Sequence, residues 1–392
     1  MKKTKKLLII TNRYPTGPND SASPFVYDFR TALQGQGITA DVVTPFYESP
    51  GIDDRYVDAG VHRFEWSDGR TVISQLPRYH PLTPVKIVRY FANGVKVASQ
   101  LHELNRYDAV IALWAIPSGH MARRLSERYQ VPYAVWTLGS DINGFAGLPV
   151  IGRMVQKVLQ GADRLFADGH ELAEKVRILT HRTCNFLPSF HAIDLKTEGA
   201  VTREKRFMAV GRIEKAKGVF DLLEAFDIFR RRYTDWRLYY VGQGRSEKEL
   251  HRRLAGRGLG EFVTCTGYLP REEVNALLVS STAAVIPSHT DSLPLTFGEA
   301  MQAGIPVIGS DVGDLPYFIE KYRVGCHFPV RDIMGLELCM EVMAENRAYY
   351  PGNFREALEE LDINNSATAV AQWLESITPE SQRARTVNAA AR

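Results

Sequence analysis

The stretch IPSHTDSLPLTFGEAMQAGIPVI, residues 286–308, contains an apolar run, a polar loop, a helical pattern and a second apolar run. Ser292 is suited to cap the helix, and Pro294 fits its first turn, where a backbone N–H is not needed. Gly304 and Pro306 mark the end of the helix. A strand, a loop, a helix and another strand in this order form the repeating unit of a parallel α/β sheet.

The same alternation continues on both sides of this stretch. In the first half, the expected strands are residues 7–11, 40–44, 108–114, 133–137 and 164–167. In the second half, they are residues 207–210, 238–241, 263–266, 283–287 and 307–310. Short apolar runs between helical patterns indicate buried parallel strands.

The alternation breaks at residues 190–203, a polar segment without apolar periodicity. Because a complete second series follows, we expect two domains, residues 1–195 and 196–362. A helix over residues 363–378 should return to the first domain, and the small and polar residues 379–392 should be a disordered tail. The predicted fold class is α/β, with two Rossmann-like domains facing each other across a cleft.

Composition and charge describe an ordinary globular chain. The 392 residues include 48 Lys and Arg against 45 Asp and Glu, and the net charge of +3 is too small to predict nucleic-acid binding. No apolar stretch of the sequence approaches the ~18 residues that span a bilayer. We therefore expect a cytoplasmic protein and, because the cysteines form no CxxC pair, cysteines that are reduced.

Two basic segments leave open a weak, peripheral association with the inner face of the membrane. Residues 1–6 are rich in lysine, which fits either a solvated chain end or a contact with anionic lipid. Residues 84–106 mix Lys and Arg with Val, Ile, Tyr and Phe, which fits either a membrane-facing amphipathic helix or a helix with its apolar side on the sheet. The sequence leaves the oligomeric state open.

Residues 210–219, VGRIEKAKGV, join a predicted strand to a predicted helix. Gly211 and Gly218 allow sharp turns at the two ends of this loop. Arg212 and Lys217 are suited to neutralise a diphosphate, Arg through a bidentate fork and Lys as a mobile charge. Spacing alone leaves a solvated basic loop as the alternative.

The loop and helix after residue 288 add groups that bind anions and hydroxyls. The amide N–H groups at the start of the helix, near Leu293 and Leu295, are suited to a phosphate. Glu299, one turn further, is placed to accept hydrogen bonds from a ribose, and Asp291 precedes the helix where a sugar on the diphosphate would lie. The alternative is two surface carboxylates beside an ordinary helix.

These residues resemble the family 4 retaining glycosyltransferases, which have the GT-B fold. The hallmark of this family is an acidic residue followed, after seven residues, by Glu. Here the two acids are Asp291 and Glu299, and the family's Pro-Ser and Glu-Ala-Met-x-Ala-Gly-x-Pro-Val sequences surround them. Residues 210–218 are similar to its Val-Gly-Arg and Lys-Gly signature. Residues 242–244 and 267–270 match further landmarks, and residues 114–119 and 137–142 match more loosely.

The resemblance implies a nucleotide-sugar site in the second domain and an acceptor site in the first. Asp291, Arg212 and Lys217 would be catalytic. The donor would be bound by Arg212, Lys217, Tyr268, Leu269, Asp291, Ser292, Leu293, Pro294, Leu295 and Glu299. Glu299 would hold the ribose, and the Tyr268 loop would border the base. No metal or other cofactor is expected, because cations and a helix terminus would stabilise the charge on the leaving diphosphate. Gly17, Ser23 and Asp141 would lie on the acceptor side.

The sequence departs from the family pattern at several positions. Asp291 stands where Glu is usual, Ser292 where Gly is common, and Leu138 where a His is frequent. Residues 313–317 read GDLPY instead of Gly-Gly-x-Pro-Glu, and residues 15–25 lack the common glycine pair. These departures concern catalytic detail and acceptor handling more than donor binding.

The expected function is retaining transfer of a hexose from a nucleotide-diphosphate sugar to a saccharide or lipid-linked acceptor in polysaccharide or glycolipid synthesis. A sugar-nucleotide epimerase on the same fold and an inactive protein that binds nucleotide sugars remain as alternatives. A nicotinamide-dependent dehydrogenase is disfavoured, because Gly242 and Gly244 are followed by Glu247 where GxGxxG needs its third glycine.

Overall fold

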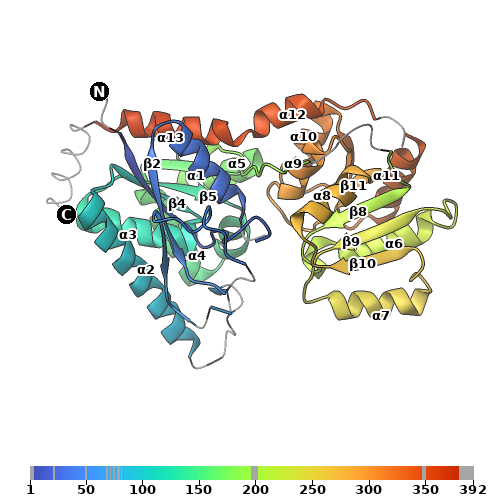
Figure 1. The fold of residues 1–392 in the computed structure, drawn as a ribbon, viewed down its shortest axis with the longest axis horizontal. Helices are drawn as coiled ribbons and strands as arrows, with labels where there is room; N and C mark the ends of the chain where they lie inside the picture. The colour runs from blue at the N-terminus through green and yellow to red at the C-terminus, as the bar shows by residue number, and fades with distance from the viewer. Residues whose placement is uncertain are drawn as a thin grey trace. The chain divides into compact units, whose positions relative to one another are not determined.

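The computed structural model describes residues 4–20, 23–48, 51–67, 69–70, 72–73, 76, 80, 82–195, 202–346 and 350–378. They form two units, each built on one parallel sheet with helices (Figure 1). Unit 1 holds the described residues up to Ser189 and those from Ile363 onward, and unit 2 holds those of Phe190–Asp362. The predicted disordered tail, residues 379–392, lies outside the described residues.

The sheet of unit 1 has the order β3-β2-β1-β4-β5-β6-β7, with every pairing parallel. Its strands are β1 (Lys6–Ile10), β2 (Thr39–Pro45), β3 (Val61–Phe64), β4 (Ala109–Leu113), β5 (Tyr133–Thr137), β6 (Arg164–Ala167) and β7 (Asn185–Phe186). Its helices are α1 (Phe25–Gly35), α2 (Thr83–Asn105), α3 (His120–Tyr129), α4 (Pro149–Gly161), α5 (His170–Thr180) and α13 (Ile363–Ser376), with short helical turns η2 (Ala115–Gly119) and η3 (Ser140–Phe145). The central strands β4 and β5 are buried throughout, as their continuous apolar sequences require.

The sheet of unit 2 has the order β10-β9-β8-β11-β12-β13 and is also parallel. Its strands are β8 (Arg206–Val210), β9 (Arg237–Val241), β10 (Val263–Gly267), β11 (Ala283–Ile286), β12 (Val307–Ser310) and β13 (Gly325–Phe328). Its helices are α6 (Val219–Phe229), α7 (Glu247–Arg257), α8 (Arg271–Val279), α9 (Leu295–Gln302), α10 (Leu315–Tyr322), α11 (Ile333–Glu345) and α12 (Phe354–Leu361), with a short turn η4 (Lys215–Lys217). In both sheets the strand order reverses beside the first strand, which is where α/β sheets bind their ligands.

The predicted α/β class is confirmed, and each of the ten predicted strands is present with ends within one residue of those expected. The strands β3, β7 and β13 were not predicted. Their sequences are VHRF, NF and GCHF, which are too short or too polar to stand out as apolar runs.

The first chain crossing between the units lies after Ser189, rather than after residue 195 as expected. Residues 190–195 join unit 2 because its helices hold their backbone. The Ile193 N–H donates to Gln302 Oε1 at 2.9 Å, and Asn275 Nδ2 donates to the Asp194 carbonyl at 3.0 Å.

The final helix, α13, belongs to unit 1 and packs against α1, as Figure 1 shows. Gln36 Nε2 donates to Thr368 Oγ1 at 3.0 Å, and Ser366 Oγ donates to the Pro188 carbonyl at 2.9 Å. Unit 1 is therefore built from both ends of the described chain. Among the described residues, none of these helices has the length and apolar character needed to cross a membrane.

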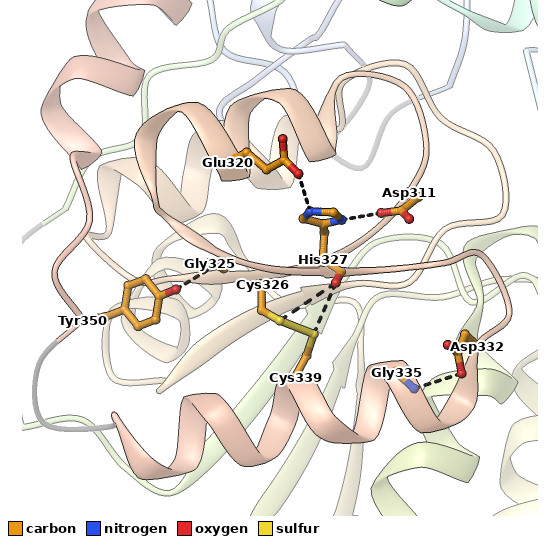
Figure 2. The surroundings of a disulfide bond; sticks show 9 residues. All are labelled: Asp311, Glu320, Gly325, Cys326, His327, Asp332, Gly335, Cys339 and Tyr350. Carbon is orange, nitrogen blue, oxygen red and sulfur yellow. Dashed lines mark hydrogen bonds and ion pairs between the residues drawn. A yellow bond between two sulfur atoms is a disulfide. The ribbon is translucent and has the colours of Figure 1, made fainter.

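The expectation of four reduced cysteines is wrong for one pair. Cys326 in β13 and Cys339 in α11 form a disulfide with their Cα atoms 5.7 Å apart, which joins the edge strand of unit 2 to a helix (Figure 2). Cys184 and Cys265 are free thiols. Burial raises the pKa of Cys184 to about 12 and that of Cys265 to about 11, so both stay protonated and unreactive at neutral pH.

Candidate functional site

The candidate site lies where two loops leave the middle of the sheet of unit 2. Strands β8 and β11 are parallel neighbours, so the loops that follow them, residues 211–218 and 287–294, emerge at the same edge. The strand order reverses between these two strands. In an open α/β sheet this reversal creates a crevice at the carboxyl ends of the strands.

The two loops are packed backbone against backbone. Gly218 has φ +66, and a Cβ there would lie 1.8 Å from the Pro287 carbonyl oxygen, so only glycine fits this contact. The His289 N–H donates to the Ala216 carbonyl at 2.8 Å. The His289 ring also meets the Asp221 carboxylate, with Nε2 and Oδ2 2.6 Å apart, which ties the second loop to the start of α6.

Lys217 and Asp291 meet across these loops. Lys217 Nζ donates to Asp291 Oδ2 at 2.5 Å, and the two side chains are 28% and 21% exposed. Arg212 lies elsewhere: its guanidinium is exposed and pairs with Glu214 in its own loop at 3.1 Å. The structure therefore brings together Lys217, one of the two predicted diphosphate cations, and Asp291, the first acid of the motif. It does not bring Arg212 to this pair, because Arg212 pairs with Glu214.

The helix α9 begins at Leu295 with Pro294 at the N-cap and no side chain capping it. The expectation that Ser292 caps the helix is wrong, because Pro294 occupies the N-cap position and Ser292 lies two residues before it. The Ser292 backbone is held by another loop instead. Its carbonyl accepts a hydrogen bond from Asp314 N at 3.0 Å, and a Cβ on Gly313, at φ +52, would lie 1.9 Å from it. With no side-chain cap, the start of the helix keeps amide donors for an anion.

Glu299 lies inside α9 and is paired with a residue that sequence reasoning missed. Arg271 Nη1, at the start of α8, lies 2.7 Å from Glu299 Oε1, and the Glu299 side chain is only 5% exposed. A carboxylate accepts several hydrogen bonds, so Glu299 keeps capacity for hydroxyl groups. The one sequence signal was position, since Arg271 directly follows the landmark residues 267–270.

The loop that carries Tyr268 and Leu269 follows β10 at the same edge. The Tyr268 side chain is exposed and Leu269 is half-buried. The intervening loop after β9 connects them to the β8 loop: Gly242 N donates to the Gly267 carbonyl at 2.8 Å, and Ile213 N donates to the Gln243 carbonyl at 3.1 Å. The loops after β8, β9 and β10 thus form one hydrogen-bonded edge.

In unit 1, Asp141 is fully buried rather than turned toward an acceptor. Its carboxylate accepts hydrogen bonds from Ala115 N at 2.7 Å and Leu138 N at 3.3 Å. Burial raises its pKa to about 6, while the backbone hydrogen bonds act in the opposite direction. Asp141 therefore joins the loops after β4 and β5.

The other two acceptor-side residues lie near the start of α1. Gly17 is buried in the loop after β1, and a Cβ there would make only ordinary contacts, the nearest at 3.7 Å. Ser23 has φ +55, immediately before the N-cap of α1. Gly17 and Ser23 thus belong to the segment between β1 and α1, whereas the Asp141 carboxylate is held by the loops after β4 and β5. Among the described residues, no three His, Cys, Asp or Glu side chains are grouped to hold a metal ion.

Known proteins place this geometry in context. Residues 192–360 match the family model of glycosyl transferases group 1, which covers the whole candidate site. A putative teichuronic acid biosynthesis glycosyltransferase, TuaC of Bacillus subtilis, is 25% identical over 81% of this chain and 84% of its own length. Glycogen synthase of Mycobacterium tuberculosis is 30% identical over 44% of this chain and 42% of its own length.

Solved structures share the fold over nearly the whole chain. Sucrose-phosphate synthase of Thermosynechococcus elongatus superposes with a TM-score of 0.74, covering 95% of this chain and all of that one at 17% identity. HepE of Anabaena, solved with UDP, gives a TM-score of 0.72 at 15% identity over 95% of this chain and all of its own. Residues 192–360 match the group 1 glycosyl transferases, and the chain is similar to family 4 glycosyltransferases and has their GT-B fold.

Proposed function

We propose that the chain moves a sugar from a nucleotide-diphosphate donor to a saccharide or lipid-linked acceptor, with retention and without a metal ion. The observation that carries this proposal is the 2.5 Å contact between Lys217 Nζ and Asp291 Oδ2 beside the uncapped start of α9. It sets a cation, a carboxylate and free amide donors at the point where the strand order of the sheet reverses.

The diphosphate is held by Lys217 and by the first amide groups of α9. Lys217 exchanges Asp291 for a phosphate oxygen, because the diphosphate, with one negative charge on each phosphate, attracts it more strongly than one carboxylate does. Asp291 is then released to accept hydrogen bonds from the donor sugar. Arg212, exposed and paired only within its own loop, turns to the phosphates as a second cation.

These positive groups act on the step in which the bond to the sugar breaks. Negative charge grows on the leaving diphosphate, and preorganised cations and dipoles stabilise that charge. In this proposal Lys217, Arg212 and the start of α9 supply what a metal ion supplies in other transferases. No cofactor other than the nucleotide sugar is then needed.

The nucleoside lies on the loops toward β10. Glu299 accepts hydrogen bonds from the ribose, and Arg271 fixes its carboxylate in place. Tyr268 and Leu269 border the base, because their loop is hydrogen-bonded to the loops after β8 and β9. The complex of HepE with UDP-glucose supports a nucleotide-sugar donor for a protein of this fold.

The acceptor is assigned to unit 1, with synthesis of a polysaccharide or glycolipid at the cytoplasmic face of the membrane. The relative named for teichuronic acid biosynthesis supports a polysaccharide product. Exposed Val85 and Val88 on the first turns of α2, next to Lys86 and Arg89, support a weak peripheral contact with anionic lipid.

The first experiment is a thermal-shift panel of UDP, GDP and ADP with their glucose and mannose conjugates. A ligand at 100 times its dissociation constant adds about 2.7 kcal/mol of stability, so the preferred base is identified directly. No shift with any nucleotide would contradict the donor assignment.

Turnover of the nucleotide sugar found in this way then separates the alternatives. A transferase releases nucleotide faster when acceptor is added, an epimerase alters the sugar without acceptor, and an inactive binding protein does neither. The anomeric configuration of the product, read by NMR, tests retention. Unchanged turnover in EDTA tests independence from metal.

A further inference from the structure

Three neighbouring strands of unit 1 are each followed by a residue of distinctive chemistry. Arg13 follows β1, Tyr47 follows β2 and Trp66 follows β3, each within three residues of the end of its strand. Because these strands are parallel and adjacent, the three residues lie at one edge of the sheet. This is the edge at which α/β sheets bind ligands.

The side chains form a cation over a layer of aromatic rings. The Arg13 guanidinium carbon lies 4.6 Å from the centre of the Tyr47 ring. The Tyr47 and Trp66 rings have their centres 6.2 Å apart, and Trp66 contacts Tyr90 of α2 at 5.1 Å. Arg13 and Tyr47 are partly exposed, whereas Trp66 and Tyr90 are buried beneath them.

This layer carries polar groups without a partner among the described residues. Trp66 Nε1 and the Tyr90 hydroxyl are buried, and neither has a hydrogen-bond partner in the part of the chain that the structure describes. Within the described residues, the Arg13 guanidinium makes no hydrogen bond or ion pair. Buried polar groups in folded proteins are nearly always paired with protein or with ordered water, so these two donors at a ligand-binding edge are open to a partner from outside the described residues.

These groups favour an acceptor of hydrogen bonds that carries negative charge. Arginine and the indole nitrogen can only donate. Burial raises the pKa of Tyr90 well above its usual range, so its hydroxyl keeps the proton and can donate as well. Arg13 is the charged group that lowers the pKa of both Tyr47 and Tyr90 against the effect of burial, and no carboxylate of the described residues acts on either.

We propose that Arg13, Tyr47, Trp66 and Tyr90 form a subsite for an acidic saccharide. The carboxylate or phosphate of the sugar binds Arg13, and the apolar face of its ring lies on Tyr47. Oxygen atoms of the ligand that enter below Tyr47 accept hydrogen bonds from Trp66 Nε1 and the Tyr90 hydroxyl. That this saccharide is the acceptor rests on the proposed function, whereas its binding does not.

The test compares matched sugars on the full chain by ligand-observed NMR titration with saturating nucleotide diphosphate present. Glucose is set against glucuronate and against glucose 6-phosphate, and inorganic phosphate is the arm without a sugar. A charge-assisted hydrogen bond is expected to give each acidic sugar about tenfold or more tighter binding than glucose. Equal binding of glucose and the acids overturns the proposal, and phosphate that binds as tightly as glucose 6-phosphate overturns its saccharide part.

Arg13→Ala is expected to abolish the preference for acidic sugars. The matched control is Arg128→Ala, which removes another arginine that lies over a tyrosine ring of unit 1, at 5.2 Å from Tyr129, and which should keep the preference. A preference that survives Arg13→Ala overturns the proposal.

Tyr90→Phe separates a ligand contact from a structural role. Because the hydroxyl has no partner among the described residues, the variant should keep its melting temperature and bind glucuronate less tightly. Tyr133→Phe is the contrast, since its hydroxyl donates to the Val158 carbonyl at 2.7 Å and its loss should lower the melting temperature. Unchanged glucuronate binding in Tyr90→Phe overturns the role of the buried donors.

Binding of the nucleotide diphosphate, measured separately, reports on unit 2. If the unmodified chain binds no nucleotide, the proposed function fails. If nucleotide binds but Arg13→Ala leaves the affinity for acidic sugars unchanged, only the subsite proposal fails.

Discussion

Arg271 Nη1 lies 2.7 Å from Glu299 Oε1 and joins the start of α8 to the interior of α9 in unit 2. The Glu299 side chain is 5% exposed, so its charge has lost most of its water and depends on Arg271. The pair fixes one carboxylate oxygen, and in the proposed function the other one accepts hydrogen bonds from the ribose. One contact thereby serves both the stability of unit 2 and the shape of the proposed nucleoside site.

Arg271→Ala should lower the free energy of unfolding of unit 2 by about 3–5 kcal/mol, because it leaves a buried carboxylate without its partner. Glu299→Gln in the same chain should recover part of this loss. Urea denaturation measures both effects. Arg355→Ala breaks the exposed pair with Glu359 and is the control, with a change within about 0.5 kcal/mol. An Arg271→Ala chain as stable as this control would show that Glu299 does not need the pair.

Lys217→Ala should weaken binding of a nucleoside diphosphate by roughly tenfold or more and leave the free nucleoside unaffected, because Lys217 is assigned to the phosphates. Calorimetry measures the affinity of the variant for the nucleoside diphosphate, the monophosphate and the free nucleoside, so the loss can be compared with the number of phosphate charges. Lys215→Ala, in the same turn but exposed, should change nothing. Equal losses for the diphosphate and the nucleoside would place Lys217 away from the phosphates.

Gly218→Ala should separate the loops after β8 and β11, because the new methyl group would overlap the Pro287 carbonyl at a positive φ. We expect a loss of at least about 1 kcal/mol in stability together with weaker nucleotide binding. Gly256→Ala in α7 is the matched control, since nothing lies within 4 Å of the added atom. There the change should be neutral or stabilising by up to about 1 kcal/mol. Thermal melts with and without nucleotide compare the two.

Asp141 should make unit 1 less stable as the pH rises from about 4 to about 6. Its pKa of about 6 in the fold lies above the ordinary value of 3.8, so the folded chain binds more protons than the unfolded chain in this window. The accumulated loss is of order 3 kcal/mol, from about two pKa units at ~1.4 kcal/mol each.

Asp141→Asn keeps an acceptor oxygen and does not titrate, so it isolates this effect. The difference in unfolding free energy between the unmodified chain and the variant should change across the window by that amount, read from urea denaturation at successive pH values. Parallel pH profiles for the two chains would show that Asp141 is not desolvated.

The sequence predicted the α/β class and the main strands because buried parallel strands are continuous apolar runs. The strand at residues 133–137 and the strand at residues 307–310 were placed without error. The edge strand β13 was missed because its sequence, GCHF, is not a continuous apolar run, and three of its four residues are only partly buried. Turn chemistry also misled at Ser292, whose backbone is held by the Gly313 loop of a later strand.

The sequence predicted which loops carry the candidate residues, but it did not predict how their side chains pair. The motif spacing located Asp291 and Glu299, and the strand pattern located Lys217 at the same edge. No local pattern reveals that Glu299 is held by Arg271, 28 positions earlier, or that Cys326 meets Cys339 in α11. Those contacts depend on how the helices pack against the sheet, and this tertiary packing cannot be read from the local sequence.

The placement of α13 bears on how this chain is made. Unit 2 interrupts unit 1, and α1 has its packing partner only after residue 363 has been synthesised. Chains fold as they leave the ribosome, N-terminal parts first where they can. Here unit 2 can complete its own core while unit 1 still exposes the surface of α1, so α13 completes the packing of unit 1 only after the whole of unit 2 has been synthesised.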